Sequence, residues 1–82
     1  MDKNEIFSEL KNILVNDVQV NFDITPDTAL LAGAMMDSMD FMSYVTFVEE
    51  KFNLKISDED ITNQKLGIMK NMTDYISQKT NG

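Results

Sequence analysis

The chain has no cysteine and no histidine, and these two absences exclude much of the usual chemistry of proteins. Without cysteine, neither a disulfide nor a zinc–thiolate site can supplement a small hydrophobic core, and the redox compartment stays undetermined. Without histidine, the usual general base at neutral pH is missing, so a Ser–His–Asp triad cannot be assembled. Carboxylates, lysines, hydroxyls and two tyrosines remain. We therefore expect that the chain is not an enzyme by itself.

Basic residues are scarce, because seven of them stand against 14 acids and leave a net charge of −7. This charge repels the phosphate backbone and argues against nucleic acid as a partner. It favours a protein partner with a basic patch, although it also keeps a small domain in solution. Long apolar runs are missing as well, and the charged first residues lack the apolar region of a signal peptide. We expect no membrane insertion and a cytoplasmic location.

The 82 residues, 43% of them hydrophobic, are enough for a single small domain over residues 1–82 with one core. Apolar residues recur at intervals of three and four, which predicts amphipathic helices. The expected helices cover residues 3–17, 38–51, 58–63 and 68–78. Pro26, the only proline, marks a turn in the long crossover after the first helix, and the apolar content of this crossover predicts that it packs against the helices. The predicted fold is all-α, a small irregular four-helix bundle with three main helices and one short one, and we expect a monomer.

Two of the predicted helices have a clear apolar stripe that we expect to face the core. In the second helix this stripe consists of Met42, Val45, Val48 and Phe52. In the last helix it consists of Met69, Met72, Tyr75 and Ile76. Phe41 and Tyr44 fall beside the stripe of the second helix, where we expect them either to contact the crossover or to face a partner.

The segment MMDSMDFM, residues 35–42, joins the crossover to the second helix and contains the strongest candidate site. Asp37 suits the N-cap and Asp40 the third helical position, which predicts a start similar to a capping box. Ser38 then occupies the first helical position, beside backbone N–H groups that favour an anion. Because no base is available to activate Ser38, the residues favour a serine that another enzyme modifies, with the flanking acids as recognition points. On these residues alone, an ordinary serine at a helix start is the alternative.

The sequence DSMD resembles the D-S-L-[DE] motif of acyl carrier proteins and related thiolation domains. The surrounding segments are similar in the same order: ITPDTALL before the motif, VEEKFNLKISDEDI after it, and MTDYISQK near the end. The resemblance implies that a separate transferase, using Mg²⁺ and coenzyme A, attaches 4′-phosphopantetheine to Ser38. The thiol of this arm would then carry acyl groups as thioesters and present them to loading and transfer enzymes in fatty acid, polyketide or related biosynthesis.

The resemblance also implies a role in partner recognition for residues on both sides of Ser38. These residues are Asp37, Met39, Asp40, Phe41, Tyr44, Glu49, Glu50 and Ile56. The three residues that flank the serine would frame the transferase, with methionine in the place of the motif's leucine. The two glutamates match acids that family members offer to basic surfaces, and Ile56 would help to shelter an acyl chain. Ser43 stands where carriers of fatty acid synthesis usually have an acid, and the aromatic pair beside it points to different partners. The variant D-S-M of the motif also resembles D-alanyl, peptide-synthetase and polyketide carriers.

A protein of another class remains the alternative: an unmodified acidic helical adaptor that binds a basic partner through the second helix. Such an adaptor would be indifferent to Ser38→Ala, whereas a carrier would not. The acids of SDEDITNQKLGI do not make a calcium loop, because Asn63 stands where the EF-hand needs glycine and Met69 where it needs glutamate. We therefore predict no metal site.

Overall fold

The structure is a computed structural model that describes residues 1–32 and 35–81. Its elements are α1 (Lys3–Asn12), η1 (Ile13–Val18, a π-helical segment), α2 (Ser38–Phe52), α3 (Asp58–Asn63) and α4 (Met69–Asn81). Within the described residues the only β pairing is a single antiparallel bridge between Ala29 and Ile68. The predicted all-α class, with three main helices and one short one, is confirmed. None of the helices in these two ranges is long and apolar enough to cross a membrane.

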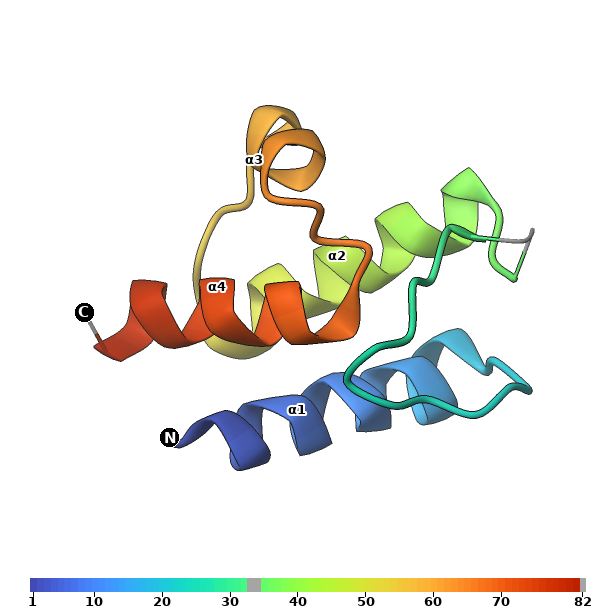
Figure 1. Ribbon diagram of the computed structural model, residues 1–82, viewed down its shortest axis with the longest axis horizontal. Coiled ribbons are helices and arrows are strands. Elements are labelled where there is room, and N and C mark those ends of the chain that lie inside the picture. Colours follow the sequence, from blue (N-terminus) through green and yellow to red (C-terminus); the bar gives the residue numbers. More distant parts are fainter. Residues whose placement is uncertain (33–34, 82) are drawn as a thin grey trace.

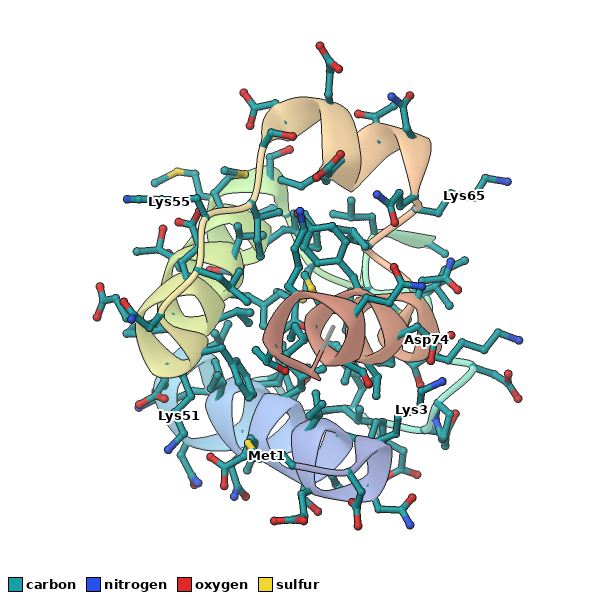
Figure 2. The ribbon with its side chains drawn as sticks, turned by 90° about the vertical axis from the view of Figure 1, so that its left-hand side faces the viewer. Met1, Lys3, Lys51, Lys55, Lys65 and Asp74 are labelled. Carbon is teal, nitrogen blue, oxygen red and sulfur yellow. The ribbon has the colours of Figure 1, made fainter. Side chains whose placement is uncertain are left out.

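The three long helices surround one core, and the short helix covers one end of it. α1 packs along α4, η1 packs against α2, and α3 lies on the side of α2 and α4 that faces away from α1 (Figure 1). Figure 2 shows the side chains filling the space between the helices. Two ion pairs join the helices at the rim of the core, Lys3 with Asp74 at 3.0 Å and Lys51 with Glu9 at 2.9 Å.

The first helix begins with a capping box that the sequence analysis missed. The backbone N–H of Glu5 donates to Oδ1 of Asp2 at 2.8 Å, and the N–H of Asp2 donates to Oε1 of Glu5 at 3.4 Å. The end of the helix also differs from the regular helix expected to residue 17, because the chain is π-helical from Ile13 onward. The carbonyl of Leu14 accepts from the N–H groups of both Gln19 and Val20, and Gln19 has a left-handed backbone with φ of 66°. These bonds widen the last turn and stop it.

The described part of the crossover, residues 19–32 and 35–37, is held mainly by its attachment to α4. The N–H groups of Met69 and Lys70, in the first turn of α4, donate to the carbonyls of Thr28 at 2.9 Å and Pro26 at 2.8 Å. The crossover thus supplies acceptors for donors that a helix start leaves without intrahelical partners. Three of its apolar side chains are buried, as expected for a crossover that packs against the helices: Ile24, Leu30 and Met36.

α2 turns a different face to the core from the one predicted. Its buried residues are Phe41, Tyr44, Val45 and Val48. Met42 is exposed and Phe52 only half-buried, so the assignment of Met42 to the core is wrong. The physical reason is that burying two aromatic rings removes more apolar surface from water than burying one methionine. In α4 the predicted inward stripe is the buried one: Met69, Met72, Tyr75 and Ile76.

Candidate functional site

Ser38 is the first residue of α2 and is exposed. Figure 1 shows the start of α2, at the end of the crossover. The N-cap is Asp37, whose Oδ1 accepts the backbone N–H of Asp40 at 2.8 Å, as predicted. The carbonyl of Asp37 also accepts the N–H of Phe41 at 3.0 Å. The start of the helix therefore depends on Asp37 and not on the Ser38 hydroxyl. A substituent on Ser38 Oγ can project into solvent without disturbing the cap.

Two substitutions distinguish the capping hydrogen bond that Asp37 accepts from the effect of its negative charge. Asp37→Ala removes the acceptor for the Asp40 N–H, so we expect the free energy of unfolding to fall by about 1 kcal/mol. Asp37→Asn keeps an acceptor in the same place, so its free energy of unfolding should fall by less than about half as much as that of Asp37→Ala. This smaller loss is the part due to the interaction of the charge with the helix dipole. Urea unfolding followed by circular dichroism measures both losses. Equal losses would show that the charge, and not the cap hydrogen bond, stabilises α2.

The outer face of α2 carries an open groove that begins at Ser38. Its lining is Ser38, Met39, Met42, Ser43, Thr46 and Phe47. Residues separated by three, four, seven and eight positions lie on one face of a helix, which explains why this set is contiguous. Three large apolar side chains in it remain exposed, to 80% for Met39, 45% for Met42 and 37% for Phe47. We call this surface the outer α2 groove.

The residues that flank Ser38 lie on the surface of the protein. Asp37, Met39 and Asp40 are all exposed around the start of α2. All three side chains are therefore accessible to a protein that binds at Ser38. Their part in recognition remains a prediction.

The two glutamates near the end of α2 have different surroundings. Glu50 is exposed. Glu49 is half-buried, and its Oε2 accepts the backbone N–H of Ile56 at 2.7 Å. This bond ties the connection after α2 back to the helix, so Glu49 has a structural role that the sequence did not reveal. Ile56 itself is buried and lies at the edge of the core.

Phe41 and Tyr44 do not form an exposed recognition face. Their side chains are 3% and 0% exposed, and their ring centroids are 5.9 Å apart with 49° between the ring planes. The Tyr44 hydroxyl lies 3.9 Å from Sδ of Met69 inside the core. The prediction that these two residues contact a partner directly is therefore wrong, because the aromatic stripe of α2 faces inward. The apolar side chains that a partner would meet there include Met42 and Phe47 instead.

Neither tyrosine can act as a base for Ser38 at neutral pH. Burial raises the pKa of the Tyr44 hydroxyl well above its ordinary value of 10. The pKa of Tyr75 rises to about 12, through burial first, then through a hydrogen bond to Asp60 and the charges of Asp60 and Glu49. The Tyr75 hydroxyl donates to Oδ2 of Asp60 at 2.7 Å, which also holds α3 against α4. Both phenols therefore stay protonated at neutral pH, so neither can accept the Ser38 proton.

Comparison with known proteins gives similarities over almost the whole chain. Residues 8–72, which include Ser38, match the family model described as a phosphopantetheine attachment site. The chain is 35% identical over 77 residues to the acyl carrier protein of Coprothermobacter proteolyticus, covering 93% of this chain and 92% of that protein. It is 30% identical over 77 residues to the acyl carrier protein of Picosynechococcus sp., and the alignment covers 93% of each chain. It is 28% identical over 82 residues to the acyl carrier protein of Petrotoga mobilis, covering 99% of this chain and 94% of that protein. No solved structure gives a significant match.

Proposed function

We propose that this chain, which belongs to the acyl carrier protein family, carries its 4′-phosphopantetheine arm on Ser38. Membership rests on the family model matched over residues 8–72 and on relatives aligned over 93% of the chain. The protein is accordingly a carrier of acyl groups with a phosphopantetheine prosthetic group, and not an enzyme. One observation above all supports Ser38 as the attachment residue. It is the exposed first residue of α2, and Asp37 supplies the cap in its place.

The start of α2 suits a phosphodiester on Ser38 Oγ. The N–H groups of the first turn and the helix dipole favour negative charge at this end. When bound, the arm supplies a thiol on which acyl groups are held as thioesters, and no side chain of this cysteine-free chain can do so. Asp37 and Asp40 add negative charge around the site, which favours partners with basic residues.

In the proposed modification, Ser38 Oγ forms a bond to the phosphorus of coenzyme A that carries the pantetheine unit. The bond from this phosphorus to the bridging oxygen breaks, and adenosine 3′,5′-bisphosphate leaves with the electron pair. In this proposed step the serine proton passes to a base of the transferase; the chain itself has no histidine to accept it. Mg²⁺ bound with the transferase offsets the charge of the phosphates.

The finer parts of the proposal concern partners and cargo. The range 1–82 acts as one monomeric, cytoplasmic carrier domain in fatty acid, polyketide or related biosynthesis. Its partners are a phosphopantetheinyl transferase and acyl-loading and acyl-transfer enzymes with basic docking patches. Asp37, Asp40 and Glu50, all exposed, support this charge preference. Ile56, at the edge of the core, is proposed to contact the acyl chain.

Intact-protein mass spectrometry tests the attachment at Ser38. The protein is incubated with coenzyme A, Mg²⁺ and a broad-specificity phosphopantetheinyl transferase, beside Ser38→Ala and a matched control, Ser43→Ala. Ser43 is exposed and lines the same groove, so its variant controls for the loss of a nearby hydroxyl. We expect one phosphopantetheine on the parent and on Ser43→Ala, and none on Ser38→Ala. Modification of Ser38→Ala would overturn the assignment, and no gain in folded parent with several transferases would favour the unmodified acidic adaptor.

A further inference from the structure

We propose that Met39 is a site of reversible oxidation by peroxide, and that its sulfoxide slows the attachment of the arm to Ser38. This inference rests on the proposed attachment at Ser38 and goes beyond it by assigning a second modification within the same motif. Methionine is the side chain of this protein that peroxide attacks first, because the chain has no cysteine and no tryptophan. The positions of the methionine sulfur atoms therefore decide which part of the protein is oxidised.

The seven methionines fall into a buried group and an exposed group. The buried ones are Met36, Met69 and Met72. Three of the four exposed ones lie within four positions of Ser38: Met35 at 42%, Met39 at 80% and Met42 at 45% exposure. The fourth is Met1, and Figure 1 shows the N-terminus at the opposite end of the molecule from the start of α2. Peroxide that attacks the folded protein therefore acts mainly around Ser38, and most readily at Met39.

Met39 is accessible without any opening of the fold. The hydrogen bonds that start α2 join Asp37 to the backbone N–H groups of Asp40 and Phe41. They leave the exposed Met39 side chain free to change its polarity while the cap stays in place. A buried methionine is reached only when the core opens, which costs free energy of unfolding. Oxidation at Met39 should therefore leave the fold unchanged.

The oxidation balances with hydrogen peroxide as the oxidant. A lone pair of the Met39 sulfur attacks one peroxide oxygen, so that an S–O bond forms as the O–O bond breaks. The transferred hydroxyl gives its proton to the departing hydroxide, and water leaves. The sulfur loses two electrons and the peroxide gains two. A methionine sulfoxide reductase reverses the change, because two of its thiols become a disulfide and the sulfoxide oxygen leaves as water.

The sulfoxide places a polar oxygen beside the hydroxyl that the transferase must reach. Consecutive Cα atoms are about 3.8 Å apart, so Met39 lies within the roughly 800 Å² that a partner centred on Ser38 covers. The thioether is apolar and adapts its shape to a partner. The sulfoxide oxygen must instead find a hydrogen-bond donor in the interface or lose its hydration at a cost. A transferase that accepts the thioether therefore binds the oxidised carrier more weakly.

Peptide mapping by mass spectrometry tests the site of oxidation. The full-length protein, before attachment of the arm, is treated with hydrogen peroxide, and catalase removes the peroxide before digestion. We expect Met39 to be oxidised about twofold faster than Met35, following their exposure, and at least about tenfold faster than the buried Met72. The circular dichroism spectrum and the melting temperature should not change while Met39 reacts. Oxidation of Met39 no faster than that of Met72 would overturn the assignment.

Steady-state kinetics of a phosphopantetheinyl transferase test the consequence. The parent, Met39→Leu and the matched control Met35→Leu are each compared with their own untreated sample, so that differences in starting rate do not enter. After oxidation we expect the parent and Met35→Leu to lose about tenfold in kcat/KM, and Met39→Leu to lose less than about twofold. The control asks whether a sulfoxide on the other side of Ser38 is enough. Treating the oxidised parent with a methionine sulfoxide reductase should restore its rate.

The outcomes separate this inference from the attachment at Ser38. A folded, untreated parent that no transferase modifies overturns the attachment, and the inference with it. An untreated parent that is modified at Ser38, with equal losses in the oxidised parent and oxidised Met39→Leu, overturns the role of Met39 alone. A parent that keeps its full rate after Met39 has been converted to the sulfoxide overturns it as well.

Discussion

Replacing Tyr44 by alanine is expected to lower the free energy of unfolding by about 4 kcal/mol. Among the described residues Tyr44 is the largest side chain that is fully buried, and its ring packs 5.9 Å from that of Phe41 between centroids. Its removal leaves a cavity between α2 and α4 that the neighbouring side chains only partly fill. Because a domain of this size has a total stability of only about 5–10 kcal/mol, a large part of it is lost. Urea unfolding followed by circular dichroism at 25 °C measures the loss.

Tyr44→Phe is the matched control, because it keeps the ring and removes only the hydroxyl. That hydroxyl lies 3.9 Å from Sδ of Met69, and a thioether is a weak acceptor. The folded protein therefore gains little from a polar group that was removed from water. We expect a stability within about 1 kcal/mol of the parent. A loss as large as that of Tyr44→Ala would show that the hydroxyl, and not the ring, holds this part of the core.

The sequence predicted the helix starts that depend on local hydrogen bonds. Asp37 accepts the N–H of Asp40, three positions later, as predicted. Ser57 accepts the N–H of Asp60 in the same way at the start of α3, so both spacings can be read from the chain. The same spacing at Asp2 and Glu5 starts α1. The position of the candidate serine at a helix start was predictable for this reason.

The face that α2 turns inward was not predictable from α2 alone. The helix has two adjacent apolar stripes, and both have helical spacing. One passes through Met42 and Val45, and the other passes through Phe41 and Tyr44. The choice depends on what lies opposite, including Met69 of α4, which is far away in the sequence. The exposed groove beside Ser38 follows from this choice, so the sequence could not reveal it either.

Contacts that a helix makes with segments outside it account for the other differences. Glu49 and Glu50 look alike in the sequence, but only the position of Ile56 in space decides that Glu49 accepts its N–H. The crossover is likewise held by donors from the first turn of α4, about 40 residues further along the chain. Local propensity carries no information about either arrangement.

Raising the pH above 10 is expected to destabilise the protein, in part through Tyr75. Burial and the hydrogen bond to Asp60 raise the pKa of this phenol to about 12 in the folded protein, against 10 for an unperturbed tyrosine. The folded state therefore favours the protonated form. The stability that Tyr75 contributes is fully present below pH 10 and is lost as the pH rises through 12. Ionisation would also place a phenolate against the carboxylate of Asp60, 2.7 Å from the phenol oxygen, and weaken the contact of α3 with α4.

Tyr75→Phe isolates this contribution, because every other ionisable group is the same in both proteins and cancels in the difference. At pH 8 we expect the parent to be more stable than the variant by about 1 kcal/mol, the worth of the hydrogen bond to Asp60. Between pH 10 and 12 the free energy of unfolding should fall more steeply in the parent, so that the advantage disappears or reverses. Urea unfolding at pH 8, 10, 11 and 12 measures the difference. A difference that stays constant over this range would contradict the prediction, since it would mean that the Tyr75 phenol has the same pKa in the folded and the unfolded chain.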